Sequence, residues 1–437
     1  MDSIWTNTAQ PPSLPTARRR NVKTDVLIIG GGMAGILCAQ RLRRAGVNCL
    51  LVEADCIGGG VTQNTTAKIT LQHGLIYDTM VQRFGVSLAR LYLEAQRDAL
   101  EAFRTTCSRV DCDYEEKDSY VYATDAEGKA RLRREAAVLQ QLGCRATLTE
   151  RIPLPLPVTG AVCVKGQAQF HPLKFLYAMA VDLPIWEHTR VIELTPDGAL
   201  TNRGMISAHT TIVATHFPFL NKHGSYFLKL YQSRSYALAL DNVPYCEGMY
   251  VDESDKGLSF RWYNGLLLLG GGGHRTGKTG GGWRALESFA AKHYPRARTV
   301  ARWATQDCMT LDGIPYIGQY SKRTPNLYVA TGFNKWGMTA SMVAANLLCD
   351  LVQGKANPYA AVFSPSRSIM RPQLALNALE SVKGLLTPTV PRCPHLGCAL
   401  KYNKQEHSWD CACHGSRFDE KGRLLDNPAT RNKKSPD

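Results

Sequence analysis

The sequence predicts an α/β protein in which a Rossmann-like domain is combined with an antiparallel sheet and followed by a small all-β lobe. A G-x-G-x-x-G motif near residue 30 stands between an apolar run and a helical segment, which is typical of a βαβ opening. Segments rich in Tyr, Leu and Phe at 235–270 indicate antiparallel strands. Four of the 14 cysteines, together with three histidines, gather within residues 393–414. This last cluster predicts a separate metal-binding lobe.

Length, composition and charge exclude several classes of protein. A chain of 437 residues is too long for one compact core, so we expect two or three structural units. No apolar run approaches the roughly 18 residues that a membrane-spanning helix needs, and the first 24 residues lack a signal-peptide stretch. We therefore expect a cytoplasmic protein without a transmembrane segment. The net charge of +15 is scattered and not interleaved with aromatic residues, so we expect no nucleic-acid partner.

The elements follow in a consistent order along the chain. A strand at 26–29, a helix at 33–44 and a strand at 48–52 form the predicted βαβ unit. Two amphipathic helices, 87–106 and 129–142, flank a strand at 120–123 and are expected to form an insertion. Strands at 185–194 and 210–215 then return the chain to the first sheet. After the antiparallel sheet, a buried strand at 327–331 and a helix at 339–353 complete the larger part.

The glycine motif and one acidic residue predict a dinucleotide site. Gly30 permits the tight turn, Gly32 lets a pyrophosphate approach the backbone, and Gly35 allows close packing of helix and strand. The helix N-terminus then offers unpaired N–H groups to the phosphates. Glu53 ends the second strand, where a carboxylate accepts hydrogen bonds from ribose hydroxyls. FAD and NAD share this pattern, so these residues alone leave the choice between them open.

A resemblance to a known family indicates FAD. Residues 22–352 resemble the D-amino acid oxidase-like family of FAD-dependent oxidoreductases, as seen in the segments 25–35, 211–215 and 328–339. A second glycine-rich stretch, 58–68, resembles the loop of that family that lies near the ribityl chain and the isoalloxazine ring. Beyond the glycine motif and Glu53, the resemblance implies contacts to FAD from Thr66, Gly332, Gly337 and Met338, and from Val191 at the adenine.

The same resemblance implies a small-molecule substrate, an amine or an amino acid, bound on the antiparallel sheet. Family members usually hold a substrate carboxylate with an Arg or a Tyr, and an Arg suits bidentate binding. Such residues on the expected strands are Arg234, Tyr236, Arg261, Trp262 and Tyr263. The catalytic residue is unknown from the sequence. The candidates are His73, Lys68 and Arg261, although a hydrogen-bonded structural histidine explains the first better, and an ordinary exposed lysine explains the second equally well.

The C-terminal cysteines and histidines predict an iron–sulfur site. Cys393-x-His395 and Cys411-x-x-His414 each supply one cysteine and one histidine, as a Rieske [2Fe-2S] centre requires. Zinc also accepts two Cys and two His, but zinc fingers usually pair like with like in each half. The two segments 393–398 and 411–418 closely resemble the cluster loops of Rieske proteins.

The Rieske resemblance implies more than the four ligands. It implies a disulfide between Cys398 and Cys413, and a hydrogen bond from Ser416 to a bridging sulfide that raises the potential. One departure is that only a helical-looking stretch, 373–384, precedes the first loop, where a full Rieske domain has several strands. The lobe is therefore expected to lean on the flavoprotein.

These predictions divide the chain into segments and suggest a function. We expect an FAD-dependent oxidoreductase that passes electrons from reduced flavin through the Rieske cluster to an external acceptor, since histidine ligation raises a cluster potential to about −150 to +300 mV. A non-catalytic redox sensor or electron-transfer adaptor is the alternative. The expected segments are an N-terminal lead (1–23), the oxidoreductase (24–362), a linker (363–388) and the Rieske lobe (389–437). Within the oxidoreductase, the FAD-binding parts are about 24–80, 150–225 and 300–355, and the substrate-sheet and helical parts are about 81–149 and 226–299.

Overall fold

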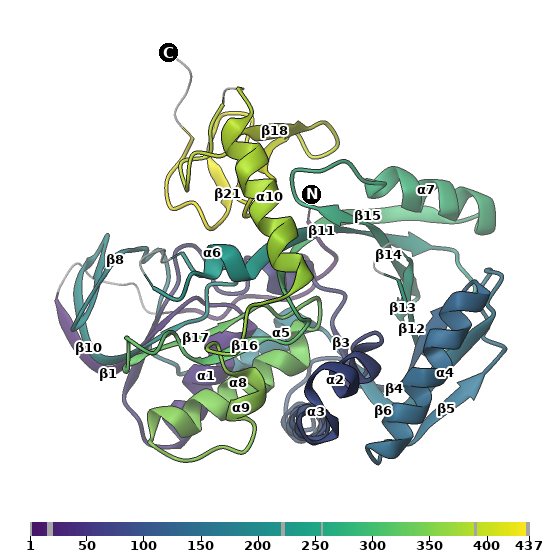
Figure 1. Ribbon diagram of the computed structural model, residues 1–437, viewed down its shortest axis with the longest axis horizontal. Helices are drawn as coiled ribbons and strands as arrows, with labels where there is room; N and C mark the ends of the chain where they lie inside the picture. The colour runs from purple at the N-terminus through teal and green to yellow at the C-terminus, as the bar shows by residue number, and fades with distance from the viewer. Residues whose placement is uncertain (1, 15–20, 220–222, 255–256, 389–390, 434–437) are drawn as a thin grey trace.

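The computed structural model describes residues 2–14, 21–219, 223–254, 257–388 and 391–433. Residues 389–390 and 434–437, at the two ends of the expected lobe, lie outside the described residues. The described strands form sheets of eight, nine and four strands. Figure 1 shows the four-stranded sheet as a separate lobe stacked on the larger part of the molecule.

The eight-stranded sheet is the predicted Rossmann-like sheet. Six of its strands follow the order β16-β17-β10-β1-β2-β7, and the hairpin β8–β9 joins through the pairing of β9 with β10. Strand β1 pairs in parallel with β2 and β10, and its inner residues are buried because both faces of the sheet are covered. Helices α1, α5 and α8 cover one face, and the hairpin β8–β9 covers the other. The bounds are β1 Val22–Ile29, β2 Cys49–Val52, β7 Ile185–Trp186, β8 Val191–Thr195, β9 Gly198–Thr201, β10 Gly204–Val213, β16 Tyr316–Gln319, β17 Leu327–Thr331, α1 Met33–Arg44, α5 Pro172–Ala180 and α8 Gly337–Val352.

The nine-stranded sheet contains the predicted antiparallel strands, in the order β15-β11-β14-β13-β12-β4-β6-β3, with β5 beside β6. The segment expected as an insertion contributes β4 to this sheet, where β4 pairs in parallel with β12. The strands are β3 Lys68–Ile69, β4 Glu115–Ala123, β5 Ala146–Thr149, β6 Gly160–Gln169, β11 Leu230–Asp241, β12 Met249–Asp252, β13 Ser259–Tyr263, β14 Leu266–Arg275 and β15 Arg298–Thr310. The helices beside them are α2 Ile76–Phe84, α3 Val86–Cys107, α4 Ala126–Gln141 and α7 Gly282–His293.

The four-stranded sheet is an antiparallel meander of short strands, and its core contains four cysteines with Leu400, Phe418 and Ala429. Helix α10 (Pro372–Leu386) occupies most of the stretch expected as a linker. Figure 1 shows this helix running from the lobe down the outside of the molecule. The strands are β18 Leu400–Asn403, β19 Ser408–Cys411, β20 Arg417–Asp419 and β21 Leu424–Asp426, and the short helices elsewhere are η1 Val61–Asn64, α6 Tyr226–Lys229 and α9 Ala360–Phe363.

One expectation about the elements needs correction. The strand expected at 185–194 is two strands, β7 and β8, because the chain turns at His188, whose φ is +52°. The N-terminal lead is anchored to the body: the Trp5 side chain is fully buried, and its indole N–H donates to the Thr65 carbonyl at 2.8 Å. Trp5 also packs against Tyr263 of β13, with 4.8 Å between ring centroids. The lead therefore ties the second glycine-rich loop to the nine-stranded sheet.

The helices in the described part of the chain were compared with the length and apolarity that a bilayer-spanning helix requires. None of them is both long enough and apolar enough to cross a bilayer.

Candidate functional site

A cavity of about 900 Å³ lies where the two large sheets and the lobe meet. Its wall includes the β1–α1 turn, the loop 58–68, parts of β11 and β15, and the segment 333–338. Residues 424–430 of the lobe, with the exception of Pro428, complete the wall on one side. The predicted cofactor site and the predicted cluster lobe therefore share one cavity.

The glycine motif forms a close-packed turn at the edge of this cavity. Gly30 has φ +114°, and a Cβ there would lie 2.6 Å from the Ala214 carbonyl oxygen. A Cβ on Gly35 would clash with the Gly30 carbonyl, whereas a Cβ on Gly32 would meet only the Thr62 hydroxyl, at 3.5 Å. Helix α1 has no acidic residue in its first turn and no side-chain cap. This arrangement fits a pyrophosphate group at the N-terminus of α1.

Seven of the nine predicted cofactor residues line the cavity. Gly35 and Gly332 do not: a Cβ on Gly35 would clash with the Gly30 carbonyl, and a Cβ on Gly332 would lie 2.3 Å from the Thr310 side chain. The Glu53 carboxylate accepts hydrogen bonds from the backbone N–H groups of Gly31 (2.7 Å) and Asp55 (2.9 Å), while burial raises its pKa. The seven lining residues are Gly30, Gly32, Glu53, Thr66, Val191, Gly337 and Met338.

Lys68 is the predicted catalytic candidate that best fits the cavity. Its ammonium group lies in the wall and donates to the Thr66 hydroxyl at 3.0 Å. Burial, with a smaller contribution from Arg261, lowers the pKa of Lys68 to about 7. A lysine that is partly neutral near pH 7 can accept a proton.

His73 reaches the cavity wall, but both of its ring nitrogens are engaged. Nε2 lies 2.8 Å from the Thr70 carbonyl, which can only accept, so Nε2 carries the proton and Nδ1 accepts from the Tyr92 hydroxyl at 2.7 Å. Burial lowers the pKa of His73 to about 3. The ring stacks on Trp336 with 5.0 Å between centroids. His73 is therefore a neutral, fully hydrogen-bonded side chain that orders the wall.

The arginines expected on the substrate side have other partners. Arg261 is fully buried and donates to the carbonyls of Thr66, Ala67 (3.0 Å) and Phe170 (2.9 Å). It lies behind the wall and secures the loop 58–68, which corrects its placement as a catalytic or carboxylate-binding candidate. Arg234 is ion-paired with Glu406 of the lobe. Of the five predicted strand residues, only Tyr236 lines the cavity.

Two further residues in the wall were not foreseen from the sequence. Asp307 on β15 is a carboxylate facing the cavity, and burial raises its pKa to about 6 while Lys335 and Arg234 oppose that rise. His216 follows β10 with φ +65°, and burial lowers its pKa to about 4. The position of His216 directly after the 211–215 strand was the only signal in the sequence that could have indicated it.

The four predicted cluster ligands come together in the two loops of the lobe. Cys393, Cys411 and His414 are buried and His395 is partly exposed. The two imidazole rings lie 4.9 Å apart at an angle of 87°. Neither ring nitrogen of His414 has a hydrogen-bond partner among the described residues, an arrangement expected of a metal ligand.

The protonation behaviour of these side chains also fits a metal site. Burial lowers the pKa of His395 to about 4 and that of His414 to about 3, so both imidazoles are neutral near pH 7. The Cys411 thiol donates toward Cys393 and, with backbone N–H groups of the loop, lowers the pKa of Cys393 to about 7. The pKa of Cys411 rises in turn. Metal binding requires neutral imidazoles and thiolates, and this set can supply both.

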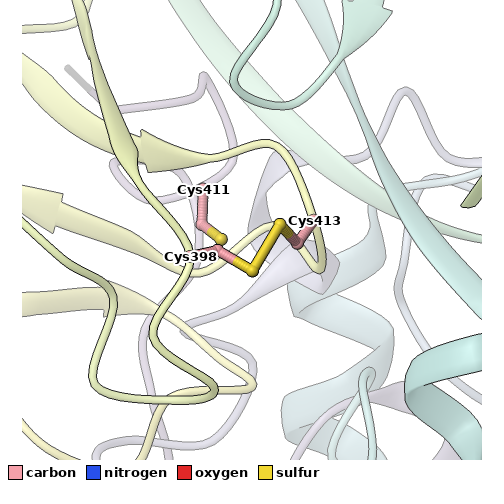
Figure 2. A group of neighbouring side chains, drawn as sticks. All are labelled: Cys398, Cys411 and Cys413. Carbon is pink, nitrogen blue, oxygen red and sulfur yellow. A yellow bond between two sulfur atoms is a disulfide. The ribbon is translucent and has the colours of Figure 1, made fainter. Parts of the chain in front are cut away.

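The remaining cysteines of the lobe are joined. Cys398 and Cys413 form a disulfide that ties the two loops together (Figure 2). The Cys411 sulfur lies within 4.8 Å of both, but Cys398 and Cys413 have no thiolate to offer as ligands. The Ser416 hydroxyl accepts from the Ala429 N–H at 3.0 Å, so its own proton is available to the loop.

The cluster loops rest directly on the nine-stranded sheet. The Gln232 amide donates to the carbonyls of His414 (3.0 Å) and Asn427 (2.8 Å), and Gln306 donates to the Gly415 carbonyl at 2.9 Å. The Arg275 guanidinium donates to the Ala412 and Cys413 carbonyls. The second cluster loop is therefore held by β11, β14 and β15 through hydrogen bonds to its backbone.

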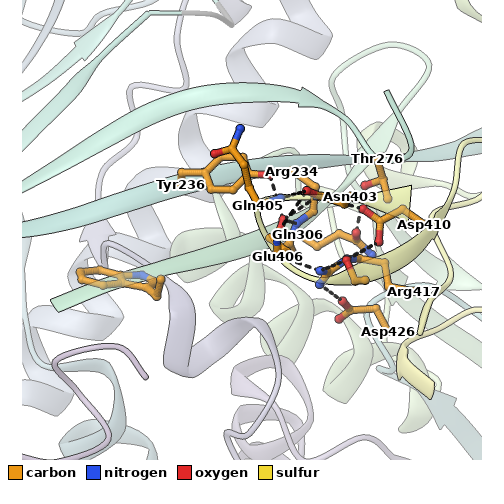
Figure 3. Close-up of polar contacts among 12 residues, drawn as sticks. Arg234, Tyr236, Thr276, Gln306, Asn403, Gln405, Glu406, Asp410, Arg417 and Asp426 are labelled. Carbon is orange, nitrogen blue, oxygen red and sulfur yellow. Dashed lines mark hydrogen bonds and ion pairs between the residues drawn. The ribbon is translucent and has the colours of Figure 1, made fainter. Parts of the chain in front are cut away.

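A buried ion-pair network makes a second attachment of the lobe (Figure 3). Glu406, in the β18–β19 turn, pairs with Arg234 of β11 and with Arg417 of β20, and it accepts a hydrogen bond from Tyr236. Arg417 also pairs with Asp410 at 3.0 Å and with Asp426 at 2.9 Å. The three side chains at its centre, Arg234, Glu406 and Arg417, are 4–7% exposed. The lobe is thus fixed to the sheet by paired charges that water scarcely reaches.

One predicted ligand faces the body of the molecule. The His414 ring packs edge-to-face against Phe217 and Phe227, with centroids 6.5 and 6.1 Å away. Asn427 of the lobe donates to the carbonyls of Thr215 (2.8 Å) and Phe217 (2.9 Å). Thr215 and His216 line the cavity, so the short segment 215–217 separates the cavity from His414.

The fold and the site define a dinucleotide-binding oxidoreductase with a Cys/His cluster lobe. A family model described as FAD dependent oxidoreductase matches residues 25–351, and one described as Rieske [2Fe-2S] domain matches residues 366–437. The chain belongs to the FAD dependent oxidoreductase family and carries a C-terminal Rieske domain. It is an oxidoreductase with FAD and a [2Fe-2S] cluster as cofactors. The Rieske match begins upstream of α10.

Individual relatives support this assignment. The chain is similar to "Putative Rieske 2Fe-2S iron-sulfur protein YhfW" of Bacillus subtilis (strain 168), with 34% identity over 98% of this chain and 96% of the relative. It is 24% identical to gamma-glutamylputrescine oxidoreductase of Escherichia coli (strain K12), over 78% of this chain and 86% of that protein. The structure of glycine oxidase from Geobacillus kaustophilus has the same fold, with a TM-score of 0.67, 22% identity and coverage of 80% and 100%.

Proposed function

We propose that this protein is a dehydrogenase of amines or amino acids that passes electrons from FAD through the Rieske cluster to an external acceptor. In this proposal Cys393, His395, Cys411 and His414 hold the cluster, and the seven residues of the cavity wall described above contact FAD. A bound FAD would supply two-electron oxidation of the substrate, and a bound Rieske cluster would supply one-electron transfer. The observation that carries the proposal is that the lobe forms part of the cavity wall.

The position of His414 supports an internal electron path. His414 and Phe217 pack together, and the neighbouring residues Thr215 and His216 are in the wall of the cavity. Hydrogen bonds from Gln232, Gln306 and Asn427 hold the lobe in this position. A lobe secured in this way needs no movement to bring its cluster near the flavin.

The charges in the cavity support a cationic amine as the group that is oxidised. Asp307 is ionised near pH 7 and can attract an ammonium group. Lys68 can accept the proton that an ammonium substrate must lose before oxidation, since its pKa is about 7. Among the described residues, Arg190 is the only arginine in the wall, and it lies next to Val191 of the expected adenine site. The bidentate arginine that often holds an α-carboxylate is therefore not supplied by β11 or β13.

The same charges favour catalysis over the alternative of a redox sensor or adaptor. A flavin that only relays electrons needs no substrate space and would be expected against apolar side chains. Here the cavity wall contains Lys68, Tyr236 and Asp307, three polar side chains outside the set assigned to FAD.

The first test measures the cofactors and the substrate. Protein purified without oxygen is expected to contain FAD and iron in a ratio of one flavin to two irons, and to give a Rieske-type EPR signal after chemical reduction. In stopped-flow mixing with panels of amines and amino acids, amines are expected to be the first compounds to bleach the flavin. The signal of the reduced cluster is expected to follow the bleaching. Zinc in place of iron would overturn the cluster assignment, and failure of every substrate to bleach the flavin would overturn the dehydrogenase.

The second test uses the pH dependence of flavin reduction. If neutral Lys68 accepts the proton, the rate rises with pH through an apparent pKa of about 7. Lys68→Met is expected to abolish this rise and to slow reduction by about 10²-fold or more. The matched control is Lys229→Met, which removes a buried lysine that bonds to the Pro365 carbonyl outside the cavity. An unchanged pH profile in Lys68→Met would exclude Lys68 as the base.

A further inference from the structure

Helix α10 turns an apolar face toward solvent. The exposed fractions are 53% for Leu376, 62% for Leu379, 52% for Val382, 50% for Leu385 and 77% for Leu386. At about 100° per residue, these side chains fall within one half of the helix circumference. Lys383 is the charged residue on that half. A surface helix of a globular protein normally has the reverse arrangement, with its apolar stripe against the core.

The polar side of α10 packs against the rest of the protein. Asn377 is buried and accepts from the Arg275 guanidinium at 2.8 Å, and Glu380 pairs with Lys278 at 2.6 Å. Gly384 packs so closely that a Cβ there would lie 2.6 Å from the Cys413 sulfur. Because these contacts set the rotation of the helix, its leucines cannot turn inward without breaking them.

The apolar face continues onto the first cluster loop. A Cβ on Gly397 would lie 4.0 Å from the Leu385 side chain, and Leu396 is 41% exposed. The Arg392 guanidinium donates to the carbonyls of Gly384 and Leu385, which fixes the end of α10 against this loop. The loop also carries His395, the predicted ligand that is partly exposed. The face and the outer side of the cluster site thus form one surface.

We propose that this surface, consisting of the α10 face and Leu396, binds an anionic lipid bilayer, with α10 lying in the interface. A protruding helix with leucines on its outer side can immerse that side among the acyl chains. Its 15 residues are too few to span a bilayer. The net charge of +15 attracts the protein to anionic headgroups, and the single acidic residue of α10, Glu380, is already neutralised by Lys278.

The charge also argues against a second copy of the chain as the occupant. Two copies would each bring a net charge of +15 to the contact, and like charges oppose association. Docking on a bilayer would place the His395 side of the lobe toward the membrane. The external electron acceptor would then be dissolved in the bilayer or attached to it, a conclusion that rests on the proposed function, whereas the docking does not.

The test is flotation of the full-length holoprotein with lipid vesicles. Vesicles of phosphatidylcholine with about 30% phosphatidylglycerol are compared with vesicles of phosphatidylcholine alone. The wild type is expected to float with the anionic vesicles and to bind the neutral ones more weakly. The double variant Leu379→Gln/Leu386→Gln is expected to bind the anionic vesicles about tenfold less tightly or worse.

A matched control removes exposed apolar side chains elsewhere. Ile192 on β8 and Val300 on β15 are 60% and 51% exposed, and Ile192→Gln/Val300→Gln is expected to bind vesicles like the wild type. All variants are expected to keep their flavin and iron, since none of these side chains is in the cavity wall or at a ligand position. Flotation needs no turnover, so it remains informative even if no substrate reduces the flavin.

Three results would overturn the proposal. The first is a wild type that floats with neither kind of vesicle, which would assign the face to a protein partner. The second is a wild type that binds both kinds of vesicle equally, which would exclude a role of the charge, or an equal loss of vesicle binding in the two double variants, which would exclude a specific role of α10. The third is a dimer, detected by light scattering, that Leu379→Gln/Leu386→Gln dissociates.

Discussion

The FAD site and the cluster lobe are built in opposite ways. At the FAD site, Gly30, Gly35 and Glu53 belong to one βαβ unit, in which Gly35 packs on the Gly30 carbonyl and Glu53 accepts from the Gly31 N–H. The cluster loops are equally short in sequence, but Gln232 lies 182 residues from His414 and Gln306 lies 109 residues from Gly415. The ligands of the lobe are thus encoded locally, while their support comes from a distant sheet.

This difference teaches that a recognisable cofactor motif does not imply an independent domain. The core of the lobe has few apolar side chains besides its cysteines, and a unit of this size usually needs a disulfide, a metal or a docking partner to remain folded. The lobe has a disulfide, predicted cluster ligands and a buried ion-pair network with β11. Changes at the lobe interface should therefore affect the cluster before they affect the flavin.

The largest expected effect separates the two cofactors completely. Cys411→Ser removes one predicted thiolate ligand, so iron per chain is expected to fall to near zero, while flavin per chain stays at the wild-type level. The measurements are iron analysis and the flavin absorption spectrum. Cys349→Ser, at a cysteine near the end of α8, is the matched control and should keep both cofactors. Loss of flavin in step with iron would show that the two sites are not separable.

The next effect tests the ion-pair network. Glu406→Gln leaves the buried charges of Arg234 and Arg417 without their shared carboxylate, which is expected to destabilise the lobe by about 3 kcal/mol. Urea unfolding followed by the visible absorption of the cluster measures this loss. Glu420→Gln changes an exposed glutamate of the same lobe and is expected to have little effect. If the two variants unfold at the same urea midpoint, the ion-pair network does not contribute to the stability of the lobe.

The pH dependence of lobe stability tests whether the same ion pairs stabilise the lobe. Burial works to raise the pKa of Glu406, but Arg234 and Arg417 outweigh it and lower the pKa below the usual value. A carboxylate with a lowered folded pKa contributes stability above its unfolded pKa of about 4.3 and loses that contribution as the pH falls. The wild-type lobe should therefore weaken on acidification below about pH 4.3. Glu406→Gln should lack this part of the acid sensitivity.

The smallest effect distinguishes docking from local strain. Gly415 has φ +87°, and a Cβ there would lie 2.5 Å from the Gln232 Cβ, so Gly415→Ala combines backbone strain with a clash at the sheet. Gly397 has φ +78° with no atom closer than 4.0 Å to a Cβ, so Gly397→Ala has the strain alone. Each variant is expected to lose about 1–2 kcal/mol of unfolding free energy because of backbone strain. Gly415→Ala is expected to lose more because of the clash with Gln232. A smaller loss of unfolding free energy for Gly415→Ala than for Gly397→Ala would show that β11 shifts to accommodate the added Cβ.

The sequence was sufficient for features whose determinants are neighbours in the chain. The βαβ unit, its glycines and the pairing of one cysteine with one histidine in each cluster loop follow from spacing alone. The helices at 87–106 and 129–142 correspond to α3 and α4, because amphipathic periodicity is a local signal. The Rieske resemblance likewise implied the Cys398–Cys413 disulfide, which the structure contains.

Other features depend on pairings that no local pattern contains. Arg234 was one of five candidates for the substrate side, but its partner in the structure is Glu406, which is 172 residues away. The indole of Trp5 is buried against a strand that begins at Ser259, and Asp307 reaches the cavity only because β15 pairs with β11. The helical character of 373–384 was visible in the sequence, but the side of α10 that faces inward depends on Asn377 and Glu380 meeting Arg275 and Lys278.

The shared cavity has a consequence for how the protein matures. Residues 424–430, which close one side of it, leave the ribosome after both large sheets have been synthesised. Flavin can therefore be loaded into a nascent chain whose cavity is still open, and folding of the lobe afterwards would shut it in. Docking of the lobe would then act as a timing step for flavin retention: variants that loosen the lobe, such as Glu406→Gln, should release FAD faster than the wild type, a difference that flavin dissociation rates can measure.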